Sequence, residues 1–178
     1  PSDAKILLKA AIRDPNPVLF IEHKALYRNP QLRETLPGAD VVGELGKART
    51  HGDGTDLVMV TYGAMVHRCL EVQQRLGNDG VGARVIDLRT IQPLDTEAIF
   101  KSVKDCGRVL IVHEDTKTGG LAGEITALIN ESVFEWLDGP VLRVAAVDAP
   151  VPFNKGLEQA FFPQIDDIEL AARRLVEY

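Results

Sequence analysis

The sequence has few of the residues that mark export, membrane insertion or metal binding. Its two cysteines, Cys69 and Cys106, lack metal-ligand spacing, so we expect reduced, structural thiols. No run of about eighteen apolar residues occurs, and the N-terminus lacks the pattern of a signal peptide. Neither a membrane span nor export is indicated, and we expect the bacterial cytoplasm or an organelle matrix.

Positive charge is also scarce. The formal net charge is -6, and the 20 lysines and arginines are scattered along the chain. A nucleic-acid-binding surface would need them in a patch or stripe, so we expect no nucleic-acid partner. An acidic protein can instead recruit a basic protein partner. A hydrophobic content of 45% in 178 residues is enough for one sizeable core.

The first 50 residues predict part of a domain followed by a linker. Asp3 is expected to cap a helix that Pro15 and Pro17 stop, and residues 18–23, "VLFIEH", predict a strand. So continuous an apolar run needs cover on both faces, which one short helix cannot supply. We therefore interpret residues 1–28 as the last αβ unit of a truncated domain and residues 29–50 as a linker.

Residues 51–178 predict a complete α/β domain. Strands and helices alternate from Asp56 onward, which indicates right-handed βαβ units and a parallel sheet between two helical layers. Cys69 and Trp136 are expected on inward helical faces. The expected strands are residues 56–63, 83–88, 108–114 and 141–147, and the expected helices are residues 64–76, 95–105, 120–138 and 164–177.

His113 and Glu114 are expected where a strand ends, and loops at the C-terminal ends of parallel strands form ligand crevices. A histidine beside a carboxylate can work as an acid/base pair. Adjacent residues on a strand point to opposite faces, however, and this favours a structural role at the strand end.

The turn after this strand, "TGGLAG", offers an anion site. Gly119 and Gly120 open a helix whose free amide groups and dipole favour an anion. The turn is not the dinucleotide fingerprint, because Thr118 stands where that pattern needs glycine. Tight turning explains the glycines at least as well. A small-anion crevice around His113, Glu114, Gly119 and Gly120 thus stays open as an alternative.

Three further features have candidate roles. Gly52, Asp53 and Gly54, with Asn78 downstream, resemble the motif that holds Mg²⁺ and diphosphate in thiamine-dependent enzymes, but they precede a predicted strand and are better explained as a surface turn. Asp148 is either solvated or paired with a partner. Tyr178 ends an amphipathic helix and is a candidate interface aromatic.

Five segments in order resemble one family, the β subunit of the thiamine-diphosphate-dependent 2-oxo acid dehydrogenase, which is the decarboxylating component of large acyl-transferring complexes. The resemblance covers essentially all 178 residues. The segments are "DPNPVLFIEHKALYR" (14–28), "VIDLRTIQPLD" (85–95), "HEDTKTGGLAGEI" (113–125), "VDAPVPF" (147–153) and "RRLVEY" (173–178).

The resemblance implies a division of labour. Such β subunits have a pyrimidine-binding domain followed by a transketolase C-terminal-like domain, so residues 1–28 resemble the end of the first and residues 51–178 the whole of the second. Thiamine diphosphate and Mg²⁺ belong to the parent enzyme. The family's cofactor-contacting residues lie upstream of Pro1 or in the α subunit. We therefore assign no catalytic, cofactor-binding or metal-binding residue to this chain.

By the same resemblance, the chain serves assembly of an enzyme that decarboxylates a 2-oxo acid and transfers the acyl group to a lipoyl arm. Its expected partners are an α subunit, separate or fused, a second β subunit, and the subunit-binding domain of the acyltransferase core. Docking is expected at Tyr178, with Asp148 the weaker candidate. The branched-chain substrate 2-oxoisovalerate is favoured, and pyruvate is the alternative.

A free-standing α/β module that binds a small ligand is the rival from another class. It predicts a monomer with an occupied crevice. The assembly hypothesis predicts an exposed apolar face and a homodimer.

Overall fold

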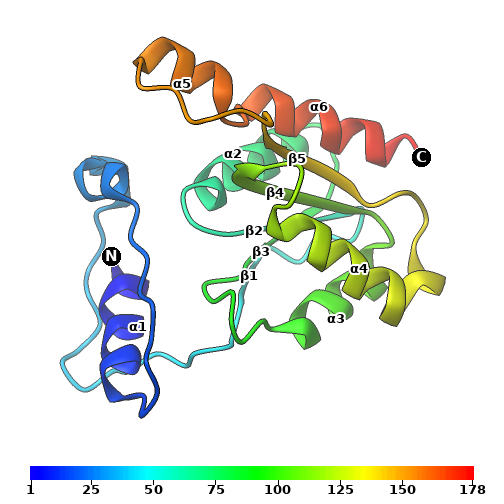
Figure 1. Cartoon of the computed structure of the whole chain (residues 1–178). Helices are drawn as coiled ribbons and strands as arrows, with labels where there is room; N and C mark the ends of the chain where they lie inside the picture. The colour runs from blue at the N-terminus through cyan, green and yellow to red at the C-terminus, as the bar shows by residue number, and fades with distance from the viewer.

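The computed structural model describes all residues 1–178, and they form two parts (Figure 1). Residues 46–178, here called the sheet domain, contain one five-stranded sheet in the order β1-β3-β2-β4-β5. β1 is antiparallel to β3, and the other neighbours are parallel. The strands are β1 (Arg49–His51), β2 (Leu57–Thr61), β3 (Ala83–Asp87), β4 (Val109–Thr116) and β5 (Leu142–Ala146).

Helices cover both faces of this sheet. One layer consists of α2 and α6 and the other of α3 and α4 (Figure 1). The helices of the sheet domain are α2 (Met65–Asn78), α3 (Thr96–Cys106), α4 (Leu121–Val133), α5 (Lys155–Phe161) and α6 (Ile165–Val176), with the 3₁₀ turn η3 (Phe134–Trp136) after α4.

The central strand β2 is buried on both faces, and this explains why its sequence is apolar without interruption. Successive side chains of a strand point to opposite faces. Leu57 and Met59 therefore belong to the core under α2 and α6, while Val58 and Val60 belong to the core under α3 and α4. All four are completely buried. The predicted three-layer α/β sandwich with a mostly parallel sheet is confirmed.

Helix α3 begins as its sequence predicts. Asp95 is its N-cap, and the side-chain carboxylate accepts a hydrogen bond from the Ala98 amide at 3.1 Å. The other carboxylate oxygen accepts a hydrogen bond from the Ala48 amide at 2.9 Å. This bond fixes the segment that leads into the sheet domain to the start of α3. Gly107 ends α3 with a φ of 67°, the left-handed conformation that favours glycine.

Two details of the sheet domain differ from expectation. Trp136 was expected to face inward, but α4 ends at Val133 and the following 3₁₀ turn leaves the indole 48% exposed. The Lys104 ammonium lies 5.7 Å from the centre of this ring, a cation–π contact at the surface. Strand β1 and helix α5 were not predicted.

The cysteines are structural, as predicted. Both thiols are free and buried. Burial raises the pKa of Cys69 to about 12 and that of Cys106 to about 11, so neither is a thiolate at neutral pH.

Residues 1–45, here called the N-terminal arm, lie beside the sheet domain (Figure 1). The arm consists of α1 (Ser2–Arg13), two 3₁₀ turns, η1 (Lys24–Arg28) and η2 (Pro30–Leu32), and extended segments between them. Asp3 does not cap α1, which starts one residue earlier, at Ser2. Its carboxylate instead pairs with Arg49 at 2.8 Å and with Arg89 at 3.0 Å, so it joins the arm to the sheet domain.

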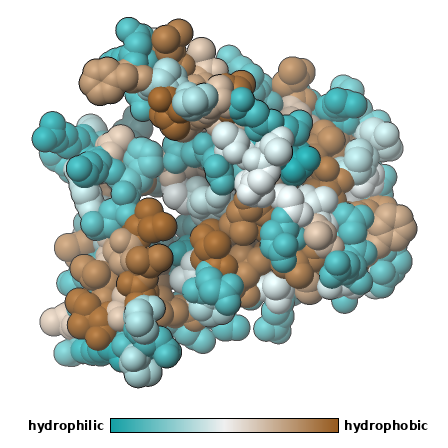
Figure 2. All heavy atoms as spheres, viewed as in Figure 1, coloured by the Kyte–Doolittle hydropathy of each residue, from teal (hydrophilic) through white to brown (hydrophobic).

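The strand expected over residues 18–23 is absent, and this prediction is wrong. The segment pairs with no other strand of the chain, so its backbone groups have no ladder to join. Leu19 and Ile21 are 93% and 91% exposed. Hydrophobic side chains gather on this part of the surface (Figure 2). No helix anywhere in the structure has both the length and the apolarity that crossing a membrane requires.

Candidate functional site

The candidate crevice lies at the C-terminal edge of the parallel sheet, where loops follow β2 and β4. Tyr62 follows β2, His113 lies in the second half of β4, and Gly119 and Gly120 form the turn into α4. Ligands of open α/β sheets usually bind at this edge.

His113 is completely buried, and neither ring nitrogen has a hydrogen-bond partner in the protein. Its ring is stacked on that of Tyr62, with 6.3 Å between the ring centroids and 20° between the planes. Burial lowers the pKa of His113 and also raises the pKa of Tyr62, because desolvation disfavours each charged form. The imidazole is therefore a neutral packing group at neutral pH.

Glu114 points away from His113, as the alternation of a strand requires. Its side chain is partly exposed, and its Oε1 lies 3.5 Å from the Nε2 of His23 in the N-terminal arm. The two neighbours thus have different partners, and they do not form an acid/base pair. The expected divergence of their side chains is confirmed.

The glycine turn packs directly on the buried histidine. A Cβ atom on Gly120 would lie 2.3 Å from the carbonyl oxygen of Thr116 and 2.5 Å from Cε1 of His113, so no larger residue fits there without movement. Gly119 has a φ of 77°. Close packing and tight turning therefore account for both glycines without a ligand.

Asp148 holds the same loop from its other side. The backbone amide and the hydroxyl of Thr118 donate to the two carboxylate oxygens of Asp148, at 2.9 Å and 2.6 Å. These bonds lower the pKa of Asp148. Sequence reasoning expected a solvated or partner-bound carboxylate, and no local signal links two residues thirty positions apart.

Tyr178 lies at the opposite end of β5 from Asp148. Its side chain is 67% exposed and covers Gly139, which precedes β5, whereas Asp148 follows that strand. The two residues proposed for docking are therefore not brought together into one patch.

The segment Gly52–Gly54 does not fit a metal diphosphate group. It connects β1 to β2 and so leads into a strand instead of a helix, and Asn78 is the last residue of α2. A Cβ atom on Gly54 would lie 2.2 Å from the carbonyl carbon of Gly82, so this turn packs against backbone and leaves no cradle. The structure brings together no group of three His, Cys, Asp or Glu side chains able to hold a metal ion. The surface-turn interpretation is supported.

Residues 46–168 match the family model of the transketolase C-terminal domain. The chain belongs to this family. Over its whole length it is similar to β subunits of 2-oxo acid dehydrogenases, which confirms the resemblance drawn from its motifs.

Two relatives from Bacillus subtilis are matched equally well. The chain is 44% identical over 179 residues to 2-oxoisovalerate dehydrogenase subunit beta, and 44% identical over 178 residues to pyruvate dehydrogenase E1 component subunit beta. Each alignment covers 100% of this chain and 54% of the relative. The chain thus spans about half the length of the curated relatives it matches, and identity does not separate the branched-chain type from the pyruvate type.

Solved structures support the fold alone. A split-gene transketolase, described as an inactive β4 tetramer, superposes with a TM-score of 0.67 at 24% identity, over 81% of this chain and 46% of that one. A 2-oxoglutarate:ferredoxin oxidoreductase from Magnetococcus marinus superposes with a TM-score of 0.52 at 11% identity, over 73% of this chain and 20% of that one. The predicted transketolase C-terminal fold is confirmed.

Proposed function

We propose that this chain is the assembly and partner-docking part of the β subunit of a 2-oxo acid dehydrogenase complex. The observation that carries the proposal is the 44% identity across the whole chain to two such β subunits. The parent enzyme would decarboxylate a 2-oxo acid oxidatively and transfer the acyl group to a lipoyl arm. 2-Oxoisovalerate is our favoured substrate, and pyruvate is the alternative.

Catalysis in the parent enzyme would reside outside these residues. His113 is a buried packing group, Glu114 faces the arm, and the Gly52–Gly54 turn leaves no space for a diphosphate. Thiamine diphosphate supplies an electron sink when bound, and the protein supplies binding and orientation. We propose that other parts of the parent enzyme hold this cofactor and its Mg²⁺.

The apolar surface of the N-terminal arm supports a role in assembly. Leu19, Ile21 and Ile12 are the most exposed large aliphatic side chains of the arm, and Leu8, Val18, Leu36 and Val41 are exposed as well. Exposed apolar surface of this kind marks a face that another protein surface covers. We propose that residues 1–28 are the last αβ unit of the pyrimidine-binding domain, that residues 29–50 are the interdomain linker, and that the remainder of the parent protein covers the arm.

Docking of the acyltransferase core is proposed at the C-terminal end of the sheet domain. Tyr178 is an exposed aromatic residue, and the net negative charge of the chain suits a basic subunit-binding domain. Asp148 is the weaker candidate because Thr118 already occupies both of its oxygens. An α subunit and a second β subunit complete the proposed assembly. Its proposed location is a bacterial cytoplasm or an organelle matrix, and the Arabidopsis thaliana relative is named as mitochondrial.

A pair of chimeras tests the proposal. Residues 1–178 would replace the matching segment in each of the two Bacillus subtilis β subunits, and each chimera would be purified with its host α subunit. Size-exclusion chromatography with light scattering reports assembly, and decarboxylation of 2-oxoisovalerate and of pyruvate reports activity. We expect both chimeras to assemble and to keep the substrate preference of the host.

Two outcomes would contradict the proposal. Failure of both chimeras to assemble, when each host β subunit assembles in parallel, would exclude the assembly role. A substrate preference that follows the inserted chain would show that these residues shape the substrate pocket.

A further inference from the structure

The outer edge of β5 is open. β5 is the last strand of the sheet and pairs only with β4. Apart from this ladder, no backbone group of residues 142–146 has a hydrogen-bond partner in the protein, and the next amide along the chain, that of Val147, turns away to the Phe161 carbonyl. An unpaired strand edge is a template on which another extended chain can add.

A surface hollow of about 350 Å³ runs across this edge. Its apolar part is formed by Val141 and Leu142 at the start of β5 and by Leu170 and Ala171 of α6, and α6 packs beside β5 (Figure 1). Leu170 is 73% exposed there. The apolar surface thus borders the open backbone edge, as a peptide strand with one apolar face requires.

Three cations from three different elements surround the same hollow: Lys117 from the loop after β4, Arg143 from β5 and Arg174 from α6. None of them forms an ion pair within the protein. The hollow's one carboxylate, that of Asp167, caps α6 by accepting from the Gln164 amide at 2.9 Å.

The loop that carries Lys117 is fixed in place. Nη1 of Arg143 donates to the Lys117 carbonyl at 3.2 Å, and the next residue, Thr118, is held by Asp148. Because Nη1 also lies close to Gly123 at the start of α4, Arg143 reaches the face of the sheet opposite α6. The positive charge therefore brackets the β5 edge from both faces.

We propose that the outer edge of β5 is a docking site for an extended acidic segment of a partner protein, which adds to the sheet as a sixth strand. Its backbone would pair with residues 142–146, its apolar side chains would cover Leu142 and Leu170, and its carboxylates would meet Arg143, Arg174 and Lys117. A local cluster of unpaired cations in a chain of net charge -6 is the complement of such a segment.

A second copy of this chain is a poorer occupant. Pairing of β5 with β5 about a two-fold axis would bring the same patch against itself. Arg143, Arg174 and Lys117 would then face their own copies, and like charges at an interface oppose association. This site is independent of the proposed function, because it depends only on the sheet domain.

The test uses the full chain and a synthetic peptide of alternating valine and glutamate, with a valine–lysine peptide as the matched probe. NMR-detected hydrogen exchange would follow the amides of residues 142–146, and fluorescence anisotropy would give the affinity. We expect the acidic peptide to slow exchange at this edge, and to bind about tenfold more weakly when salt screens the charges.

A charge reversal sharpens the test. We expect Arg143→Glu with Arg174→Glu to weaken binding of the acidic peptide by about tenfold or more and to create binding of the valine–lysine peptide. Lys101→Glu with Lys104→Glu, on α3 and outside this hollow, is the matched control and should change neither affinity. The single variant Arg174→Glu, at an exposed position on α6, covers the case in which the double variant fails to fold.

Three results would overturn the proposal: unchanged exchange at residues 142–146 in saturating acidic peptide, equal affinity for the two peptides, or a dimer of the chain that forms through β5 without peptide. Competition of the acidic peptide by millimolar inorganic phosphate, with no protection of the edge amides, would likewise overturn it and identify a small-anion site.

Discussion

Strand β2 and residues 18–23 have similar sequences but differ in strand pairing and in burial. Both are short apolar runs at the end of a helix or turn, "LVMVT" and "VLFIEH". β2 forms hydrogen bonds with strands on both sides and is completely buried. Residues 18–23 form no regular secondary structure and pair with no strand, and Leu19 and Ile21 are almost fully exposed.

The difference shows what an apolar run specifies. An apolar composition means that both faces of the segment must be covered by other atoms, and this requirement follows from the segment alone. The cover itself comes from neighbours. β2 has β3, β4 and two helical layers within the chain, whereas the arm has only α1 and the two short turns. Apolarity therefore indicates that a segment needs cover, but it does not show that a strand ladder within the chain supplies that cover.

The largest expected effect is on the free energy of unfolding, and it distinguishes β2 from residues 18–23. Leu57→Ala should lower the free energy of unfolding by about 3 kcal/mol, because it leaves a cavity in a filled core. Leu19→Ala should change it by less than about 0.5 kcal/mol, because that side chain is already in water. Urea denaturation of the two variants measures both values. Similar losses of stability in the two variants would mean that Leu19 is buried in solution, and the contrast drawn between β2 and residues 18–23 would be wrong.

A second pair of substitutions compares two glycines. Gly120→Ala should cost about 2 kcal/mol, because a Cβ atom would overlap both the Thr116 carbonyl and the buried ring of His113. Gly38→Ala, in the arm, should be nearly neutral, since no atom lies within 4 Å of the added carbon. Thermal unfolding by circular dichroism would rank them. A neutral Gly120→Ala would show that the turn moves freely over His113.

The pH dependence of stability should arise in part from His113. Its folded-state pKa is lowered by burial, so the unfolded chain binds a proton first as the pH falls. Its contribution to stability is therefore present above the unfolded-state pKa, about 6.5, and is lost as the pH falls through the lower folded-state pKa. His67, whose pKa is also lowered by burial, adds a contribution of the same sign.

His113→Gln should flatten this dependence, and urea titrations at pH 7.5 and pH 5.5 would measure it. Tyr62→Phe is the matched control, because it keeps the stacked ring and leaves His113 in place, so the full slope should persist. An unchanged slope in His113→Gln would assign the dependence to other groups.

The sequence predicts the sheet domain well because its signals are local. The apolar run of β2 and the capping residue Asp95 act within a few positions, and both appear in the structure as predicted. α5 had such a signal that was missed: the Asn154 side chain accepts from the amides of Gly156 and Leu157. β1 has only three residues and no apolar pattern, and its pairing with β3 depends on residues some 36 positions away.

The candidate site was predictable only in part. Alternation along β4 correctly separated His113 from Glu114. Asp148 forms hydrogen bonds with Thr118, and His23 contacts Glu114. The members of each pair are distant in sequence, so no motif spacing predicts these contacts. The open edge of β5 could not be predicted from the sequence either, because the order of the strands is a property of the folded sheet.

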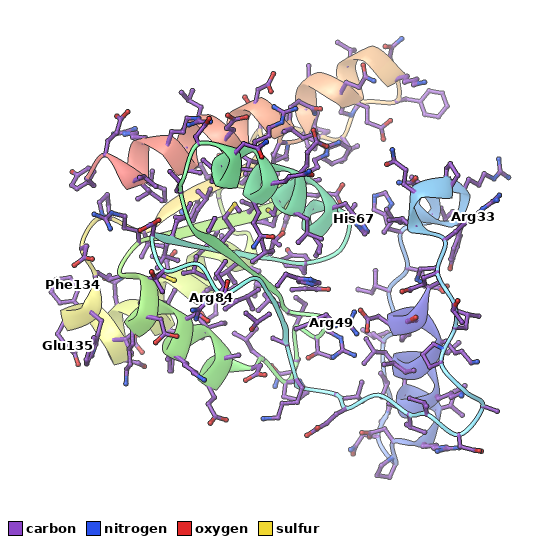
Figure 3. The ribbon with its side chains drawn as sticks, turned by 180° about the vertical axis from the view of Figure 1, so that it is seen from behind. Arg33, Arg49, His67, Arg84, Phe134 and Glu135 are labelled. Carbon is purple, nitrogen blue, oxygen red and sulfur yellow. The ribbon has the colours of Figure 1, made fainter.

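The smallest expected effect concerns the junction between the two regions. Asp3 of α1 pairs with Arg49 and Arg89 of the sheet domain, and Figure 3 shows Arg49 pointing toward α1. These ion pairs are partly exposed, so Asp3→Asn should lower the overall stability by less than about 1 kcal/mol. The arm should nevertheless loosen, because α1 buries only Leu7.

Hydrogen exchange monitored by mass spectrometry can detect this loosening. In Asp3→Asn, amides of α1 should exchange faster while those of β2 keep their protection, because the arm can open without the sheet domain. Glu44→Gln, which removes a charge in the arm that forms no ion pair, is the control. If α1 exchanges at the same rate in both variants, then the contact of Gly43 with Ile6 and Leu7, and not Asp3, holds the helix in place.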